Sequence, residues 1–176
     1  MSSLINEDFN HTIDYWIKEL DQYNFDRLCT KPADNSWSAG QVYVHLIENT
    51  TYFFEQIKVC LSSNGNANEE MSPVAKTMFL NNEFPDLVIE GPASNGYTQQ
   101  PVSKEQLMSD LLQLKDDVNT IAMLISKSSA KGKTKHEGLQ YFNANEWFRF
   151  AEMHFRHHTR QKKRIDDFLK GSSHMQ

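Results

Sequence analysis

Apolar residues recur every three or four positions in four stretches of the chain, the spacing of α-helices that each bury one face. The first two stretches hold Phe9, Ile13, Trp16 and Leu20, and then Val42, Leu46, Phe53, Ile57 and Cys60. The third holds Leu107, Leu111, Leu114, Val118, Ile121 and Ile125, and the fourth begins near Asn143. No convincing alternation of apolar and polar residues predicts a strand. The pattern therefore predicts an all-α protein, a four-helix bundle.

Start and stop signals agree with these helices. Capping-box patterns at Ser38–Gln41 and at Ser103–Gln106 precede the second and third stretches. The fourth stretch ends at Lys170–Gly171, a cation in the last turn followed by a glycine suited to a helix end. We expect one bundle domain over residues 1–170 and a short tail over residues 171–176.

Residues 62–102 form a long connection between the second and third predicted helices. Pro73–Leu80 could be a short helix, while Phe84-Pro85 and Gly91-Pro92 predict extended chain and turns. A connection of this length is unusual in a helix bundle. It is either a long crossover between the two helices or a flap over a pocket.

Composition narrows the classes of function. The net charge of -5 argues against non-specific nucleic-acid binding, and the basic run Arg160–Arg164 is interpreted as a solvated helix face. Cys29 and Cys60 stand outside any CxxC pattern, so we predict small core residues and no thiolate zinc site. The chain shows no signal-peptide pattern and no apolar run of about 20 residues, so we expect a cytoplasmic protein without membrane spans.

The fourth helix carries a histidine pair on its inner seam. That seam runs through Trp147, Ala151, His154, His158, Gln161, Ile165 and Phe168. His154 and His158 are four residues apart, a spacing at which two imidazoles on one helix face can reach one metal ion. Buried imidazoles cost free energy unless each finds a partner. That partner is a metal ion or, alternatively, water or a carboxylate.

A third ligand would have to come from another helix. His45 lies beside the apolar stripe of the second helix, with Asn49 one turn later. Glu48 and Glu152 are near the candidate ligands by spacing, but we expect both on the surface. His11 and His136 have no helical partner at ligand spacing. His157 points about 100° away from His154 and His158 on the helix, so we expect it to be exposed.

Three motifs together resemble the DinB superfamily, a group of bacterial four-helix-bundle proteins of which many bind metal. They are Trp37-Ser38, then His45-Leu46 within one long helix, and the HxxxHxxQ pattern of His154, His158 and Gln161. The stretch from His136 to Ile165 is especially similar to the second DinB subfamily. The resemblance covers essentially the whole chain, and its specificity comes from the combination because each motif alone is common.

The resemblance implies that His45, His154 and His158 are the metal ligands. It makes Gln161 a residue that supports a ligand or packs beside it. Three neutral nitrogens leave at least one coordination position for water or substrate, as in catalytic metal sites. Histidine ligation suits a divalent zinc, nickel or iron ion, and the sequence does not choose among them.

Relatives in the superfamily include small-thiol S-transferases and isomerases. The leading hypothesis is therefore a metal-dependent enzyme that acts on a small molecule with a low-molecular-weight thiol, in stress or detoxification. The alternatives are a metal-assisted hydrolase and a non-catalytic metal- or ligand-binding bundle. The sequence identifies no catalytic acid or base, and a homodimer stays open.

Overall fold

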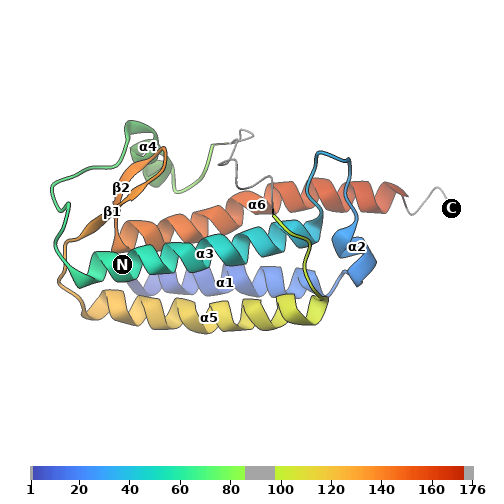
Figure 1. Cartoon of the computed structure of the whole chain (residues 1–176), viewed down its shortest axis with the longest axis horizontal. Coiled ribbons are helices and arrows are strands. Elements are labelled where there is room, and N and C mark those ends of the chain that lie inside the picture. The colour runs from blue at the N-terminus through green and yellow to red at the C-terminus, as the bar shows by residue number, and fades with distance from the viewer. Residues whose placement is uncertain (1, 86–97, 173–176) are drawn as a thin grey trace.

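The structure, a computed structural model, describes residues 2–85 and 98–172. Four long helices lie side by side (Figure 1): α1 (Ser2–Leu20), α3 (Ala39–Ser62), α5 (Lys104–Lys127) and α6 (Ala144–Ser172). Smaller elements sit at the two ends of the bundle: α2 (Phe25–Cys29), α4 (Pro73–Asn81), β1 (Lys133–His136) and β2 (Gln140–Asn143). The predicted four-helix bundle is confirmed. None of the helices described has the length and apolarity that a membrane crossing requires.

The two helices that carry the candidate ligands both begin with a reciprocal capping box. At α3, Ser38 accepts a bond from the backbone N–H of Gln41, whose side chain accepts from the N–H of Ser38, both at 3.1 Å. Asn143 and Glu146 make the same pair of bonds at α6, at 3.0 and 2.8 Å. Each box satisfies two backbone donors that a helix end leaves free, which fixes where the helix starts. Ser103 forms half of the box predicted for α5, by capping an N–H at 3.0 Å.

The core contains the apolar faces that the periodicity predicts. All the apolar residues named above for α1, α3 and α5 are at most 7% exposed. In α6, Phe168 is 39% exposed, and Leu169, one turn after the buried Ile165, takes the inner position instead. Cys60 is buried as predicted, but Cys29 is only partly buried, so the prediction of two core cysteines holds for one of them.

A small antiparallel hairpin before α6 adds to the all-α bundle two short strands that the sequence did not predict. β1 pairs with β2 from Lys133 opposite Asn143 to His136 opposite Gln140, and Gly138 takes a positive φ of 84° in the turn. The indole nitrogen of Trp147 donates to the hydroxyl of Thr134 at 2.7 Å, which ties the hairpin to the first turn of α6. Each strand has only four residues, too few to show a clear alternation in the sequence.

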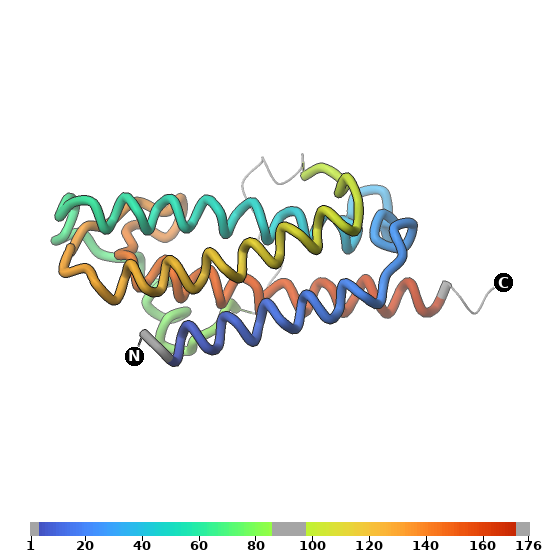
Figure 2. Tube along the Cα trace, turned by 90° about the horizontal axis from the view of Figure 1, so that it is seen from below, coloured from blue at the N-terminus to red at the C-terminus, as the bar shows by residue number. Residues whose placement is uncertain are grey.

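The helix directions explain the long connection between α3 and α5. These two helices run in the same direction, so the chain must travel back along the bundle between them (Figures 1 and 2). α3 packs most extensively on α6, and α1 on α5. On the way, Met71 forms a bridge with Gln140 of the hairpin. Residues 86–97, with the predicted turn at Gly91-Pro92, lie outside the described residues, and so does that part of the connection for which a flap was the alternative to a crossover.

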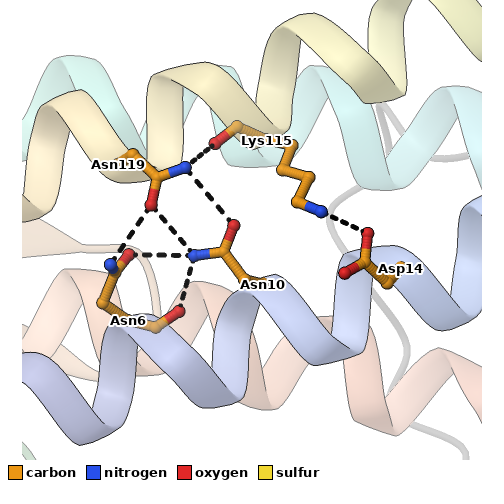
Figure 3. Close-up of polar contacts among 5 residues, drawn as sticks. All are labelled: Asn6, Asn10, Asp14, Lys115 and Asn119. Carbon is orange, nitrogen blue, oxygen red and sulfur yellow. Dashed lines mark hydrogen bonds and ion pairs between the residues drawn. The ribbon is translucent and has the colours of Figure 1, made fainter.

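Polar side chains line the outer edge of the contact between α1 and α5 (Figure 3). The amide nitrogens of Asn6 and Asn10 donate to the side-chain oxygen of Asn119 at 3.2 and 3.1 Å. One turn away, Lys115 pairs with Asp14. Exposed pairs of this kind contribute little free energy individually. They set the register of α1 against α5, while the apolar faces behind them supply the stability.

One cation of the basic run is buried rather than solvated. Lys162 is 2% exposed, and its ammonium group lies 2.7 Å from carboxylate oxygens of Glu19 and of Asp166. Tyr23 donates a hydrogen bond to Asp166 and its ring faces the Lys162 ammonium at 5.3 Å. Burial by itself would lower the pKa of Lys162, but the bonds to the two carboxylates outweigh it and raise that pKa. Lys163 and Arg164 are exposed, as predicted for the whole run.

Replacing Lys162 by methionine should therefore destabilise the fold. The substitution keeps the apolar stem but leaves two partly buried carboxylates without their cation, which costs roughly 2 to 4 kcal/mol. Urea denaturation at neutral pH measures the change. Lys163→Met, next to it on the exposed face, is the control and should change stability by less than about 0.5 kcal/mol. Equal effects of the two substitutions would contradict a structural role for Lys162.

Candidate metal centre

The structure brings together the three histidines named from the sequence. His45 of α3 and His154 and His158 of α6 are 5%, 8% and 8% exposed. The Nε2 atom of His154 lies 3.1 Å from that of His45 and 3.1 Å from that of His158. Among the residues described, they form the one group of three or more His, Cys, Asp or Glu side chains arranged to hold a metal ion.

The spacing of these nitrogens suits a common metal ion. Two histidine nitrogens on a tetrahedral zinc ion, each bonded at 2.0–2.1 Å, are about 3.3 Å apart. The contacts at 3.1 Å are within a few tenths of an ångström of that value. The ligand atoms of His45 and His158 lie within 4.8 Å of each other, so binding would draw these two rings closer together.

Hydrogen bonds among the three rings cannot satisfy all of their Nε2 atoms. The side-chain oxygen of Gln161 lies 2.8 Å from His158 Nδ1 and can only accept, so Nδ1 carries the hydrogen and Nε2 presents a lone pair. A ring nitrogen offers either one hydrogen or one lone pair. When all three rings are neutral, at most one of the two contacts of His154 Nε2 is a linear hydrogen bond. A cation would use all three lone pairs at once.

Side chains one turn along each helix orient two of the imidazoles. Gln161 fixes the tautomer of His158 in which Nε2 is free to bind a metal. The amide nitrogen of Asn49 lies 3.0 Å from His45 Nδ1 and donates to the His45 carbonyl oxygen at 2.9 Å. In this orientation His45 Nδ1 accepts from Asn49, so metal binding through His45 Nε2 would require the ring hydrogen to move to Nδ1 and the Asn49 amide to adjust. Within residues 2–85 and 98–172, His154 Nδ1 has no hydrogen-bond partner.

The three rings are held in the neutral form that a metal requires. Burial, followed by the nearby His157, lowers the pKa of His45 to about 4. Burial and then the charge of His45 lower the pKa of His158 to about 3. The pKa of His154 is also well below its ordinary value, again chiefly because of burial and then because of His158. At neutral pH all three histidines therefore keep their lone pairs.

The two nearby glutamates have different environments. Glu48 is exposed, as expected from the sequence. Glu152 is buried, which corrects the prediction of a surface position. Its carboxylate makes two bonds to Arg156, at 2.7 and 2.8 Å, and accepts a hydrogen bond from Thr12 at 3.0 Å. A carboxylate so fully bonded is a structural group rather than a free acid or base.

Aromatic side chains that the motif search did not assign to the site also contact the histidines. Trp37, used above only as part of a family motif, lies with its ring centroid 4.8 Å from that of His45. Phe84, from the crossover, lies 6.1 Å from His154 and stacks on His157 at 5.0 Å. His157 is therefore partly buried rather than exposed. These contacts join parts of the chain that are distant in sequence, so helical spacing carries no signal of them.

Comparison with known proteins supports the fold. No protein-family model matches the sequence, and no curated protein matches it. A similar solved structure is that of YfiT from Bacillus subtilis, described as a probable metal-dependent hydrolase with an unusual four-helix bundle topology. The two share 12% sequence identity with a TM-score of 0.56, over 94% of this chain and 87% of that chain. This supports the four-helix-bundle fold expected from the sequence, while membership of the DinB superfamily stays a prediction.

The lowered histidine pKa values predict how the stability of the metal-free protein depends on pH. An unfolded histidine titrates near 6.5, so below that pH the unfolded chain binds more protons than the folded protein. The free energy of unfolding should be at its full value above about pH 6.5 and should fall as the pH drops toward 4. Each buried histidine contributes roughly 1.4 kcal/mol per pH unit. Urea denaturation of chelator-treated protein between pH 7.5 and 4.5 measures the slope.

A variant that lacks one of the buried histidines, and so binds one proton fewer on unfolding at low pH, provides the control. His158→Met keeps an apolar side chain in the same place, so its slope should be shallower by roughly 1.4 kcal/mol per pH unit. A slope identical to that of the unsubstituted protein would mean that His158 is not held neutral by the fold.

Proposed function

We propose that this chain is a metal-dependent enzyme that holds one divalent ion on His45, His154 and His158. The observation that carries the proposal is the convergence of three buried Nε2 atoms whose lone pairs cannot all be satisfied by hydrogens. The described part of the chain brings no carboxylate or thiolate into this ligand group. The chemistry of the donors fits zinc, nickel or iron equally well.

Three protein ligands are the number typical of catalytic sites, which leave a position for water or substrate. When bound, such an ion lowers the pKa of a coordinated nucleophile toward 7 and polarises an electrophile beside it. The residues of the chain supply the orientation. Gln161 and Asn49 hold the rings of His158 and His45, and the surrounding core keeps bulk water away from the three nitrogens.

We place hydrolysis of a small molecule first. YfiT, whose fold this chain shares, is described as a probable metal-dependent hydrolase. In this reaction water would attack the electrophilic centre of the substrate. Transfer of a low-molecular-weight thiol would use the same site with sulfur as the nucleophile, and it rests on the sequence resemblance to the DinB superfamily alone. A metal-binding protein without catalysis would hold the ion but turn over neither kind of substrate.

Loss of one ligand should remove metal and activity together. His158→Ala takes a ligand from the middle of α6, where alanine favours the helix. Protein purified without a metal-affinity column would be analysed for bound zinc, nickel and iron. It would then be assayed for hydrolysis of nitrophenyl esters and for conjugation of small thiols to an activated aryl halide. We expect the variant to lose its metal and at least about 100-fold of the rate in whichever assay the unsubstituted protein passes.

His11→Ala is the matched control, because His11 is an exposed histidine on α1. It should keep both metal and rate. If His158→Ala loses its metal but keeps the rate, the ion is not catalytic. If the metal-loaded protein turns over neither ester nor aryl halide, the non-catalytic binding protein becomes the better description.

Removing the ion should lower the melting temperature. An ion present at 100 times its dissociation constant stabilises the folded state by about 2.7 kcal/mol. For a domain of this size, that corresponds to about 5 to 11 °C. Calorimetry of the metal-loaded protein at pH 7.5, before and after a chelator, measures the shift. The same chelator should leave the melting temperature of His158→Ala unchanged, which separates loss of the ion from other effects of the chelator.

A further inference from the structure

Aromatic rings from separate parts of the chain surround the three histidines. Trp37, in the segment between α2 and α3, lies 4.8 Å from His45 and nearly parallel to His158, at 6.4 Å and 16°. Phe53 of α3 lies 5.7 Å from His154, and Phe84 of the crossover lies 6.1 Å from the same ring. Aromatic rings therefore form much of the wall of the candidate metal centre, beside the amides of Asn49 and Gln161.

Trp37 contacts two of the three histidines. It is partly exposed, whereas His45 and His158 against it are almost fully buried. Phe53 is also buried. A molecule that approaches the histidines past Trp37 would therefore meet the indole before it reached the nitrogens. No other element of the candidate centre combines contact with two of the histidines and partial access to solvent in the described residues.

The backbone around Trp37 is firmly held. Ser38, the next residue, caps α3 and bonds through its hydroxyl to the side chain of Gln100 at 2.8 Å. Gln41 donates to the carbonyl oxygen of Thr98 at 2.6 Å. A Cβ on Gly40 would lie 2.7 Å from Pro101, so only glycine allows this close approach. The backbone that carries the indole is thus held in place, and the ring itself contacts His45 and His158, as a residue that selects a substrate by shape has to.

Aromatic rings and the amides of Asn49 and Gln161 lie against the three histidines. None of these groups carries a formal charge that could pair with a phosphorylated or otherwise highly charged substrate. A flat apolar group would find a ring to stack on.

We propose that Trp37 determines specificity by stacking on a flat, uncharged ring of the substrate next to the group that reacts. This inference rests on the proposed function, because it needs an ion on the three histidines. Ring pairs of this kind favour binding by up to about tenfold beyond the burial of apolar surface. The substrate class is accordingly a small aryl compound, such as an aryl ester, rather than a sugar phosphate or an aliphatic acid.

Cobalt-loaded protein tests this without relying on turnover. Benzohydroxamate and acetohydroxamate chelate a metal through the same atoms and differ in a phenyl ring and a methyl group. Their dissociation constants would be measured from the cobalt absorption bands. The preference is the dissociation constant of acetohydroxamate divided by that of benzohydroxamate. We expect this ratio to be about tenfold larger for the unsubstituted protein than for Trp37→Ala, with Trp37→Phe in between. Because the ligands and the metal are the same throughout, differences in intrinsic chelation cancel in this ratio.

Two further measurements separate recognition from folding and metal binding. Cobalt affinity should be the same in all variants, and Phe25→Ala, which removes an exposed ring of α2, should keep the preference of the unsubstituted protein. Cobalt should quench indole fluorescence, and Trp37→Phe should lose most of that quenching. The other two tryptophans, Trp16 and Trp147, make no ring contact with His45, His154 or His158 in the described structure.

The outcomes distinguish this inference from the function on which it rests. If cobalt binds and Trp37→Ala retains the full preference for benzohydroxamate, Trp37 does not select the substrate, and the metal centre stands. If the unsubstituted protein binds no more cobalt than His158→Ala does, the three histidines do not form a metal centre, and both proposals are wrong.

Discussion

The packing of α3 against α6 buries three imidazoles with their Nε2 atoms pointed at one another, and this contact is the constraint on which the candidate centre depends. It is the most extensive helix pairing in the bundle. It is also unfavourable in part, because neutral rings cannot fill two contacts at 3.1 Å with hydrogens. The capping boxes at both helix starts and the apolar layers around the site supply the stability that holds this arrangement. Stability gained elsewhere thus keeps the nitrogens in place.

Much of this could be predicted from the sequence, because helical periodicity reports which face of a helix is buried. The seams of α1, α3 and α5 follow from it directly, and so does the shared face of His154 and His158. The closeness of His45 to the α6 histidines does not follow from periodicity, because no local rule relates residues more than 100 positions apart. That assignment came from the family resemblance, and the structure now brings His45 to the other two.

The predictions that failed share a physical cause. Glu152 and Lys162 were expected on the surface because charged side chains usually stay in water. Both are buried because an opposite charge four residues later, Arg156 or Asp166, bonds to them, and a third group from α1 completes each cluster. Periodicity records polarity but not the identity of a partner across the bundle. The hairpin before α6 was missed for a related reason, since its pairing is a contact between segments too short to carry a pattern.

Along α6, three polar pairs at a spacing of four residues face three different parts of the bundle. Glu152 with Arg156 and Lys162 with Asp166 are pairs of opposite charge, so each largely satisfies itself. His154 and His158, a pair that overlaps Glu152 and Arg156 in sequence, are two identical groups and cannot do so. A residue of α1 completes each charged pair: Thr12 bonds to Glu152, and Glu19 bonds to Lys162. The histidine pair instead receives a third imidazole, that of His45, from α3. Within the described chain nothing supplies the missing positive charge, and a divalent cation is the group that would satisfy all three lone pairs together.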